Sequence, residues 1–403
     1  MRIVLMNQFF WPDAVATSQI LTDVALPLAE AHEVIAICGR SNAAIANSDQ
    51  RLGPGISVIR TRTLGFTHKK LGRIVSYLSF LAGAVFHGFT VRKPDVYVTL
   101  TTPPLLPIIG SVLSSLREAR HVIWEMDVYP DIATGVGYFK RGSWIDRLSG
   151  AVIDWARRRA DVIIVLGEDM KARLQSHGIP ADKIQVVENW ADGVQIRPLP
   201  FPQGPLVIQY SGNFGLAHEA DTITGVIERL KNHPDIKFVF AGGGSRRLPL
   251  MELCKAKGIR NVEFKEYCDR AELGQSLSEC HLGLVTQLSE TVGCVVPSKI
   301  YGIMAAGRPL LYIGPGGSTP AEHIRRFSCG WHIPPGDING LEQLLLDLNQ
   351  NRNLIAEAGV RARDKFVQSF DRPIGVARIL QLIEANAQTT EAVPVFNESS
   401  QGD

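Results

Sequence analysis

The sequence predicts an α/β protein of two doubly wound domains, each a parallel sheet with helices on both faces. Short β-branched runs alternate with helical stretches along almost the whole chain. A proline-rich segment at 196–205 (IRPLPFPQGP) separates two such series. The length of 403 residues, 45% of them hydrophobic, is enough for two cores.

The expected strands are short apolar runs of the kind that fills a buried parallel sheet. In the first domain, residues 1–195, they are 2–7, 33–39, 56–61, 95–100, 121–126 and 161–166. In the second domain, residues 206–365, they are 206–212, 236–242, 262–267, 282–287 and 309–314. Helices are expected between most of them, because parallel strands need crossover connections.

The remaining segments connect or extend these domains. Residues 196–205 contain four prolines, which neither a helix interior nor a central strand tolerates, so this segment is expected to be the linker. A C-terminal helix at 366–385 can pack back on the first domain. After Glu384 the composition turns small and polar, so residues 386–403 are expected to form a flexible tail.

Composition excludes several classes of function. The net charge is only +2, from 42 basic and 40 acidic residues, which argues against a nucleic-acid partner. Six cysteines lie far apart without a C-x2-C pair, so neither a metal site nor a disulfide framework is expected. The N-terminus has no secretory signal pattern. A cytoplasmic protein fits these features.

Residues 74–91 (IVSYLSFLAGAVFHGFTV) form 18 uncharged positions, near the lower length limit of a membrane span. Three interpretations stay open: a span, a buried helix that also touches a bilayer surface, and a plain core helix. Arginines at 157–159 suit the end of a helix, whose dipole they complement. They can also join the basic residues around 74–91 in a face toward anionic lipid. These neighbours are Lys69, Lys70, Arg73, Arg92 and Lys93.

Three strands of the second domain are expected to end in glycine-rich turns at one edge of the sheet. The turns are 211–215 (SGNFG), 242–244 (GGG) and 314–318 (GPGGS). Glycines let backbone amides approach a phosphate, and a following helix supplies its positive N-terminus. A tight strand-to-helix turn is the competing interpretation. No G-x-G-x-x-G follows the first strand and no Walker lysine follows these loops.

Lys299 is the strongest candidate for a phosphate contact. Pro297 and Ser298 suit the cap and first turn of the helix that follows (IYGIMAAG). A lysine in a first helical turn opposes the helix dipole, which favours a ligand-binding role over a solvated surface position. Backbone amides together with the Lys299 ammonium would receive a diphosphate.

Three stretches resemble family 4 glycosyltransferases of GT-B fold. They are PSKIYGIMAAGRP (297–309), YSGNFGLAH (210–218) and NQFFWPD (7–13). The resemblance covers nearly the whole chain and is nearest to the bacterial branch that builds cell-surface polysaccharides, including fucosyl and N-acetylfucosaminyl transferases. It implies transfer of a sugar from a nucleotide-diphosphate sugar to a lipid-linked or oligosaccharide acceptor. The anomeric configuration would be retained, and neither a cofactor nor a metal would be needed.

The resemblance also implies roles for single residues. The donor would bind the second domain, with the diphosphate at the first turn and at Lys299, and the nucleoside near the second turn. The implied donor-binding residues are Ser211, Gly212, Asn213, Phe214, Gly242, Gly243, Tyr267, Pro297, Ser298 and Lys299.

The acceptor would bind the first domain, at loops after strands. Trp11, Asp13 and Thr17 follow the first strand, and Asp127 and Asp131 follow the strand at 121–126. Asp127 is the candidate group to orient or deprotonate the acceptor hydroxyl, and the other four are candidate acceptor contacts. Capping of the next helix, or packing in a surface turn, is the alternative for these residues.

One departure from the family pattern concerns a pair of glutamates spaced Glu-x7-Glu. In this chain the two positions are Val295 and Gly302. Two alternatives therefore stay open beside the transferase: a GT-B sugar-nucleotide epimerase, and a catalytically weak donor-binding subunit of a transferase complex. The transferase itself is expected in the cytoplasm, with a peripheral contact at the inner face of the membrane.

Overall fold

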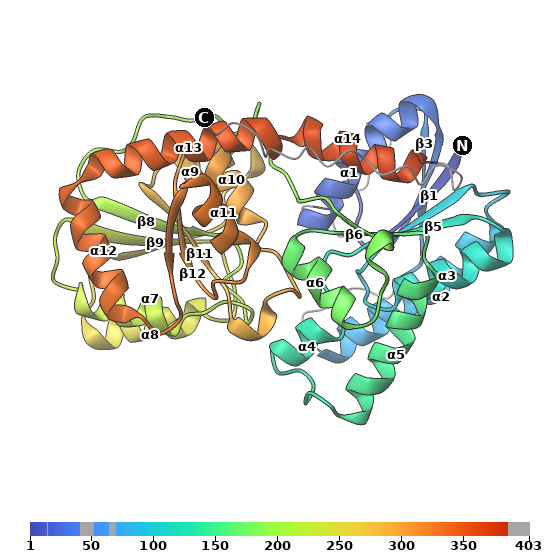
Figure 1. Ribbon diagram of the computed structural model, residues 1–403, viewed down its shortest axis with the longest axis horizontal. Coiled ribbons are helices and arrows are strands. Elements are labelled where there is room, and N and C mark those ends of the chain that lie inside the picture. The colour runs from blue at the N-terminus through green and yellow to red at the C-terminus, as the bar shows by residue number, and fades with distance from the viewer. Residues whose placement is uncertain (14, 41–51, 64–69, 386–403) are drawn as a thin grey trace, which may run out of the picture.

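The computed structural model describes residues 1–13, 15–40, 52–63 and 70–385, with the backbone alone for 70, 71 and 73. Lys69, the side chains of Lys70 and Arg73, and the expected tail at 386–403 lie outside the described residues. The chain forms two α/β units, each around one parallel sheet (Figure 1). The predicted fold class is confirmed.

The first sheet has seven described strands in the order β3-β2-β1-β4-β5-β6-β7, all parallel. β1 and β4 occupy its centre, and the residues of β1 from Ile3 to Met6 are fully buried because helices cover both faces of the sheet. The strand order reverses between β1 and β4, which opens a crevice at their carboxyl ends. The strands are β1 Arg2–Met6, β2 Glu33–Cys38, β3 Ile56–Arg60, β4 Val96–Leu100, β5 Arg120–Trp124, β6 Val162–Val165 and β7 Ile184–Val186.

The second sheet repeats this topology with six described parallel strands in the order β10-β9-β8-β11-β12-β13. Its order reverses between β8 and β11, so a second crevice opens at their carboxyl ends. The strands are β8 Leu206–Ser211, β9 Ile236–Ala241, β10 Val262–Lys265, β11 Leu282–Thr286, β12 Leu310–Ile313 and β13 Gly330–Ile333.

Helices cover both faces of each sheet. In the first unit, one face carries α1 (Ala16–Ala31) and α14 (Arg372–Glu384), and the other carries α2 (Lys70–Thr90), α3 (Leu106–Arg117) and α5 (Trp144–Arg159). The short helices α4 (Asp131–Gly135) and α6 (Glu168–Ser176) follow β5 and β6. In the second unit, α7 (Asp221–Arg229), α8 (Arg247–Lys257) and α12 (Ile338–Gln350) lie opposite α9 (Leu273–Ser278), α10 (Lys299–Ala305), α11 (Thr319–Phe327) and α13 (Arg352–Ser369).

Two strands were not expected from the sequence. β7 and β13 lie at the edges of their sheets and pair on one side only. β7 spans three residues, and β13 (GWHI) contains a glycine and a histidine, so neither presents the long apolar run by which the other strands were predicted.

The segment at 196–205 is held on the second unit by one buried arginine. Arg308 is 1% exposed, and its guanidinium donates to the carbonyl oxygens of Leu199 at 2.9 Å and Pro200 at 3.1 Å. The same guanidinium lies 4.1 Å from the centroid of the Phe201 ring. Because its prolines carry no N–H group, this segment forms neither a helix nor a strand that would pair its carbonyl groups. Arg308 supplies the hydrogen-bond donors for two of these carbonyl groups instead.

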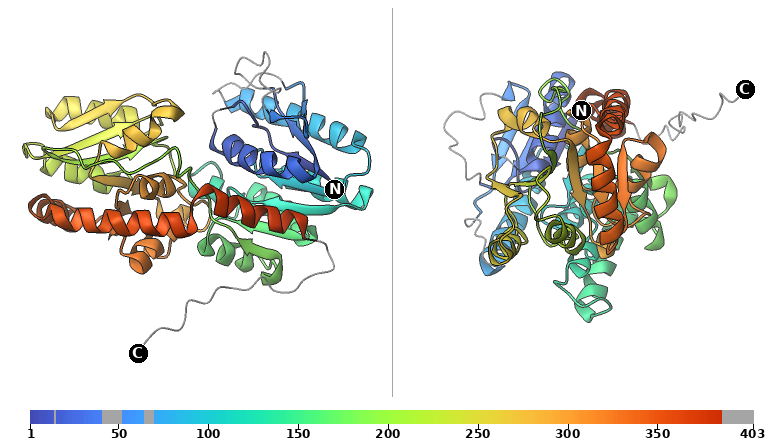
Figure 2. Two further views of the ribbon diagram at one scale, coloured as in Figure 1. Left: turned by 90° about the horizontal axis from the view of Figure 1, so that it is seen from above. Right: turned by 90° about the vertical axis from the view of Figure 1, so that its left-hand side faces the viewer.

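The C-terminal helices run along both units (Figure 2). α13 packs on the second unit, whereas Ile379 and Ile383 of α14 are fully buried in the core of the first. The break between the helices has a local cause. Asp371 caps α14 by accepting a hydrogen bond from the amide of Arg372 at 2.8 Å, and Pro373 has no N–H to continue a helix.

The apolar segment predicted at 74–91 lies almost wholly in α2. No helix in the described part of the chain is long and apolar enough to cross a membrane. Phe80 and Ala84 are fully buried against the first sheet, whereas Phe86 and Phe89 are exposed. One side of this helix therefore belongs to the core and the other faces outward.

Candidate functional site

A cavity of about 390 Å³ lies between the two units, where the carboxyl ends of both sheets face each other. The first unit contributes α1 and the segment after β7, and the second contributes the ends of β8 and β9, the loop after β10, and α9 and α10. Its lining includes Gln19, Asp23, Trp190, Asp192, Ser211, Gly212, Tyr267, Arg270, Ser298, Lys299 and Gly302. The cavity thus contains five of the ten predicted donor-binding residues: Ser211, Gly212, Tyr267, Ser298 and Lys299.

The Lys299 ammonium is held against the ring of Tyr210. Its Nζ lies 3.7 Å from the ring centroid and donates a hydrogen bond to the Tyr210 hydroxyl. Among the described residues no carboxylate forms a salt bridge with it. Burial lowers the pKa of Lys299 to about 7. A cation that is desolvated and has no carboxylate partner is suited to receive an anion.

Tyr210 is itself held by neighbours. Burial lowers the pKa of His218 to about 3, so its ring is neutral. Its Nδ1 lies 2.8 Å from the carbonyl oxygen of Thr286, and because a carbonyl oxygen can only accept, Nδ1 carries the proton. Its Nε2 lies 3.0 Å from the Tyr210 hydroxyl. The hydroxyl donates its one proton to the carbonyl oxygen of Asn213 at 2.7 Å. Tyr210 therefore presents oxygen lone pairs to Lys299.

The glycine turns lie at the end of the cavity next to Lys299. Gly212 has φ +121°, and a Cβ atom added to it would lie 4.0 Å from the Lys299 Nζ. Gly242 has φ +117°, and an added Cβ would overlap the carbonyl oxygen of Gly212. The two turns are thus packed backbone to backbone, which only glycine allows at these φ values.

The other five predicted donor residues lie outside the cavity lining. The lining contains neither Gly242 nor Gly243, whose added Cβ atoms would contact the Tyr267 ring at 3.0 and 3.2 Å. Phe214 is 2% exposed and packs in the core of the second unit. Pro297 is buried, and Asn213 is exposed outside the cavity.

Several cavity residues were missed by sequence reasoning. Asp23 and Asp192 are both held by Arg372, whose Nη1 lies 3.7 and 2.8 Å from their carboxylates, and Trp190 donates its Nε1–H to Asp23 at 3.0 Å. Arg270 follows β10 and lines the same cavity. Helix α14 and the segment after β7 are far from α1 in the sequence and meet it only in the folded chain. Sequence spacing therefore could not predict that these residues lie together.

A second basic residue lies near the glycine turns. Arg246 follows Gly244, and its buried Nε has no hydrogen-bond partner among the described residues. Its charge and that of Lys299 add to burial in lowering the pKa of His218, so both cations act on the same region. The sequence feature that could have predicted Arg246 is its position two residues after the glycine run 242–244.

The predicted acceptor residues after β1 lie outside the cavity lining. Trp11 packs partly against the core of the first unit, and its carbonyl oxygen accepts from Arg60 at 2.6 Å. The Asp13 amide donates to the carbonyl oxygen of Phe10 at 3.0 Å. The Oγ1 of Thr17 is buried with no hydrogen-bond partner among the described residues. Gln19, two residues further on, does line the cavity.

Asp127 lies at the carboxyl end of β5, next to the second unit. The amide of the following residue, Val128, donates to the carbonyl oxygen of Cys294 at 2.8 Å. Burial, with a contribution from the nearby Glu125 charge, raises the pKa of Asp127 to about 6. Its carboxylate is half-buried and lies outside the lining of the 390 Å³ cavity. A carboxyl group with this pKa can exchange a proton near neutrality.

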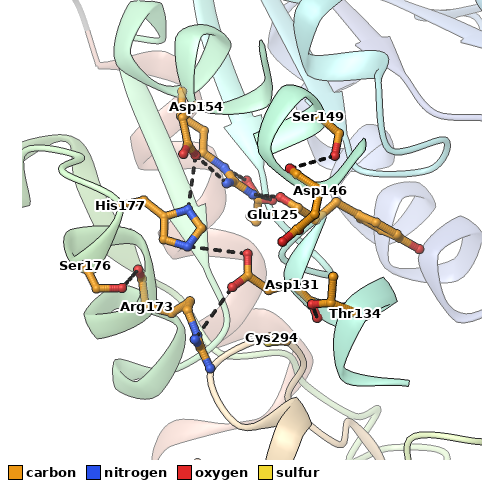
Figure 3. A network of polar contacts seen from close by, with 12 residues as sticks. Glu125, Asp131, Thr134, Asp146, Ser149, Asp154, Arg173, Ser176, His177 and Cys294 are labelled. Carbon is orange, nitrogen blue, oxygen red and sulfur yellow. Dashed lines mark hydrogen bonds and ion pairs between the residues drawn. The ribbon is translucent and has the colours of Figure 1, made fainter. Parts of the chain in front are cut away.

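Asp131 belongs instead to a network of ion pairs (Figure 3). Its carboxylate lies 3.4 Å from Nε2 of His177 and 3.6 Å from Nη1 of Arg173. Hydrogen bonds to Asp131 and Asp154 raise the pKa of His177 to about 9. Burial opposes ionisation of Asp131, but His177 and Arg173 lower its pKa overall. These contacts hold α4, α5 and α6 together.

The network extends to a fully buried ion pair and to the second unit. Arg157 is 0% exposed and donates to both carboxylate oxygens of Glu125, at 2.6 and 3.2 Å. It is therefore not part of an exposed basic face, unlike Arg158 and Arg159. Arg173 donates across the unit boundary to the carbonyl oxygen of Val292 at 3.0 Å.

The two positions of the absent glutamate pair differ in location. Gly302 lies on α10 and lines the cavity, where an added Cβ would contact Leu277 at 3.3 Å. Val295 lies outside the lining, in the loop before α10. The wall beside Gly302 is apolar, since its added Cβ would meet only Leu277 and Ile196 within 4 Å. Among the described residues no group of three or more His, Cys, Asp or Glu side chains is placed so that it could hold a metal ion.

Two doubly wound domains that enclose a cavity between the carboxyl edges of their sheets form the GT-B fold. Residues 17–190 match the glycosyl transferase 4-like domain, and residues 193–365 match the glycosyl transferases group 1. The two matches together cover most of the chain, which therefore belongs to the glycosyltransferases that these two domains define, in agreement with the sequence resemblance.

Two curated relatives support this assignment. The probable glycosyltransferase WbjE of Pseudomonas aeruginosa is 27% identical over 63% of this chain and 66% of its own length. The putative colanic acid biosynthesis glycosyl transferase WcaI of Escherichia coli is 25% identical over 59% of this chain and 62% of its own length. The matched region thus spans slightly less than two thirds of each relative.

Solved structures share the fold over nearly the whole chain. Anabaena HepE in complex with UDP-glucose has a TM-score of 0.72 at 15% identity, covering 95% of this chain and 99% of HepE. WaaG, a glycosyltransferase involved in lipopolysaccharide biosynthesis, has a TM-score of 0.70 at 14% identity, covering 95% of this chain and 100% of WaaG.

Proposed function

We propose that this protein transfers a sugar from a nucleotide-diphosphate sugar to a lipid-linked or oligosaccharide acceptor in bacterial surface-polysaccharide biosynthesis. The anomeric configuration is retained and no metal takes part. The observation that carries the proposal is the position of Lys299, a desolvated cation at the glycine turns of the cavity between the units.

The donor diphosphate binds where Lys299, Ser298 and the turn at Ser211 and Gly212 meet. Ser298 precedes α10, and its hydroxyl makes no capping hydrogen bond, so it can bind a phosphate oxygen. As the sugar leaves, negative charge develops on the nucleoside diphosphate. Lys299 stabilises that charge by proximity, the task that a metal ion performs in other enzymes.

Asp127 acts on the acceptor hydroxyl in this proposal. With a pKa of about 6 it is mostly ionised at neutral pH, yet basic enough to accept a proton as the new bond forms. Its place at the carboxyl end of β5, beside the loop of Cys294 that leads to α10, supports this role. Trp11, Asp13 and Thr17 follow β1 at the same edge of the sheet and contribute to acceptor binding.

The surface-polysaccharide setting rests on the relatives. WcaI is named for colanic acid biosynthesis, and WaaG is a glycosyltransferase involved in lipopolysaccharide biosynthesis. HepE was solved with UDP and with UDP-glucose, which supports a nucleotide sugar as donor. The protein works in the cytoplasm, with peripheral contact at the inner face of the membrane.

A donor-binding subunit without catalysis is the second candidate, because Gly302 places no carboxylate on the cavity wall. A sugar-nucleotide epimerase is the third. Both differ from the transferase in their products: the subunit would bind nucleotide without turnover, and the epimerase would convert the donor without an acceptor.

A thermal-shift panel of nucleoside diphosphates and nucleotide sugars tests the donor site first, since a ligand of the folded state raises the melting temperature. We expect a selective rise with one nucleotide. No rise with any of them would contradict the proposal. With the nucleotide known, NMR of the product of an acceptor reaction reports the anomeric configuration, and an inverted product would refute retention.

A further inference from the structure

The charged side chains that line the cavity are divided between its two walls. The first unit contributes both acidic residues of the described lining, Asp23 and Asp192. The second unit contributes both basic residues, Arg270 and Lys299. Lys299 lies at the glycine turns, where the anionic diphosphate is proposed to bind. Because carboxylates repel a diphosphate, the acidic wall is suited to another part of the ligand.

Both carboxylates are held in place by neighbouring groups. Nη1 of Arg372 lies 2.8 Å from Asp192 and 3.7 Å from Asp23, and Arg372 itself does not line the cavity. The amide of Arg372 donates to the carbonyl oxygen of Ala191 at 2.9 Å, which fixes the start of α14 beside the segment after β7. The indole Nε1–H of Trp190 donates to Asp23 at 3.0 Å. A ligand in the cavity therefore meets oriented carboxylates and not the guanidinium.

Each carboxylate keeps an oxygen that can accept a further hydrogen bond. Oδ1 of Asp192 accepts from the amides two and three residues later, at 3.0 and 3.1 Å, whereas its Oδ2 has Arg372 as its partner. Oδ2 of Asp23 accepts from Trp190, whereas its Oδ1 has only the 3.7 Å contact with Arg372 among the described residues. Each carboxylate oxygen has two lone pairs. With side-chain exposures of 14% for Asp23 and 17% for Asp192, both groups are partly shielded from water, which strengthens a hydrogen bond to them.

Hydroxyl groups are the part of a nucleotide sugar that suits this acidic wall. They donate hydrogen bonds and carry no charge, and they lie on the rings at both ends of the diphosphate, the ribose and the transferred sugar. The second unit offers them no carboxylate in the described lining. Its wall carries Gly302, where an added Cβ would meet only Leu277 and Ile196 within 4 Å. Asp23 and Asp192 are therefore the carboxylates that such hydroxyls can reach in the cavity.

We propose that Asp23 and Asp192 bind vicinal hydroxyls of a sugar ring in the nucleotide sugar and so determine which ring is accepted. A hydroxyl binds a carboxylate about twice as strongly as it binds a neutral acceptor. A ring that lacks one of these hydroxyls is rejected, since a shielded carboxylate oxygen then stays unpaired. The inference rests on the proposed function, because the diphosphate at Lys299 brings the ring to the facing wall. It gives the first unit a part in donor binding.

Calorimetric titration of the full chain tests the proposal with ligands that lack single hydroxyls. The probes are UDP, GDP, ADP and CDP, the 2′-deoxy and 3′-deoxy forms of the nucleotide that binds, and its glucose conjugate. In the unaltered protein, loss of a bound hydroxyl should weaken binding about 10- to 150-fold, the range for a hydrogen bond to a charged group. In Asp23→Asn the same loss should have an effect about fivefold smaller, because the acceptor is neutral. This comparison cancels a general effect of the substitution on binding.

The two rings give different results. If the ribose is bound, the deoxynucleotides show this dependence on Asp23. If the transferred sugar is bound, Asp23→Asn leaves the affinity for the nucleoside diphosphate unchanged and weakens binding of the glucose conjugate about fivefold or more. Asp192→Asn is the second variant and should behave alike, because its amide oxygen can still accept from the same two backbone amides.

Glu30→Gln is the matched control. Glu30 is an exposed carboxylate of the same helix, α1, outside the cavity lining, so this variant should bind every probe as the unaltered protein does. The melting temperature of each variant shows that it is folded. If both aspartate variants bound all probes with the affinities of the unaltered protein, the inference would be overturned while the proposed function stood. If the unaltered protein bound none of the nucleotides, the proposed function would fail and the inference with it.

Discussion

The Nζ of Lys299 lies 3.7 Å from the centroid of the Tyr210 ring, although 89 residues separate the two in the chain. The contact joins the last residue but one of β8 to the first residue of α10. It leaves the ammonium desolvated at the glycine turns, with a ring and a hydroxyl as its partners. This arrangement keeps a cation ready for an anionic ligand.

Lys299→Ala should weaken binding of the nucleoside diphosphate by about 1.5–3 kcal/mol, the value of a hydrogen bond to a charged group. Calorimetric titration measures the change. Lys255→Ala, on the outer surface of α8, is the matched control and should bind as the unaltered protein does. If Lys299→Ala bound the nucleoside diphosphate with unchanged affinity, Lys299 would not be a phosphate-binding residue.

The same affinity should depend on pH. Because the pKa of Lys299 is about 7 in the empty protein, the side chain is increasingly neutral above pH 7 and must take up a proton to pair with a diphosphate. Affinity should therefore fall as pH rises from 7 to 9, and heat measured in buffers of different ionisation enthalpy should show proton uptake. In Lys299→Ala the fall should disappear. A flat profile in the unaltered protein would contradict the lowered pKa.

Asp127→Asn should lower the catalytic rate by about 10²–10⁴-fold, the usual contribution of a general base, and leave nucleotide affinity unchanged. In the unaltered protein the rate should rise with pH through about 6, where Asp127 loses its proton. Asp364→Asn, an exposed change on α13, is the control. If Asp127→Asn kept full activity, Asp127 would not be the general base.

Removal of one partner of the buried pair Glu125–Arg157 should destabilise the first unit. Glu125→Gln leaves the fully buried guanidinium of Arg157 with Asp154 as its remaining charged partner, and the expected loss in the free energy of unfolding is at most about 3–5 kcal/mol. Urea denaturation measures it. Arg325→Met, which breaks the exposed pair with Glu322, should leave the unfolding free energy nearly unchanged. Similar values for both variants would mean that burial of the pair has no energetic consequence.

His177 should make stability depend on pH in the alkaline range. Its pKa is raised from 6.5 to about 9 by Asp131 and Asp154, so its contribution is fully present below pH 6.5 and is lost as pH rises through 9. The total contribution of His177 to the free energy of unfolding is about 3 kcal/mol at most. His177→Gln should abolish this part of the pH dependence, whereas His233→Gln should not. If the free energy of unfolding of His177→Gln and of the unaltered protein changed in parallel with pH, this role of His177 would be refuted.

Local signals predicted most of the fold. β1 to β6 and β8 to β12 were expected because apolar runs mark strands that are buried on both faces, whereas the edge strands β7 and β13 lack such runs. The sequence pointed to four residues that line the cavity, Ser211, Gly212, Ser298 and Lys299, because glycine turns and a lysine at a helix start are local features. The ion pairs of Asp131 with Arg173 and His177 could not be predicted, because its sequence position beside Tyr129 and Pro130 does not reveal which cations lie near it in the fold.

The sequence by itself determined the fold class, the family and the residues at the glycine-turn end of the cavity, because each is encoded in short motifs with fixed spacing. Only the tertiary structure decided which polar groups face the cavity. Asp23, Asp192 and Arg372 come from three distant segments and meet because α14 returns to the first unit. It also decided that Arg157 is buried while Arg158 and Arg159 are exposed, since adjacent residues on a helix point in different directions and only packing selects the inner one.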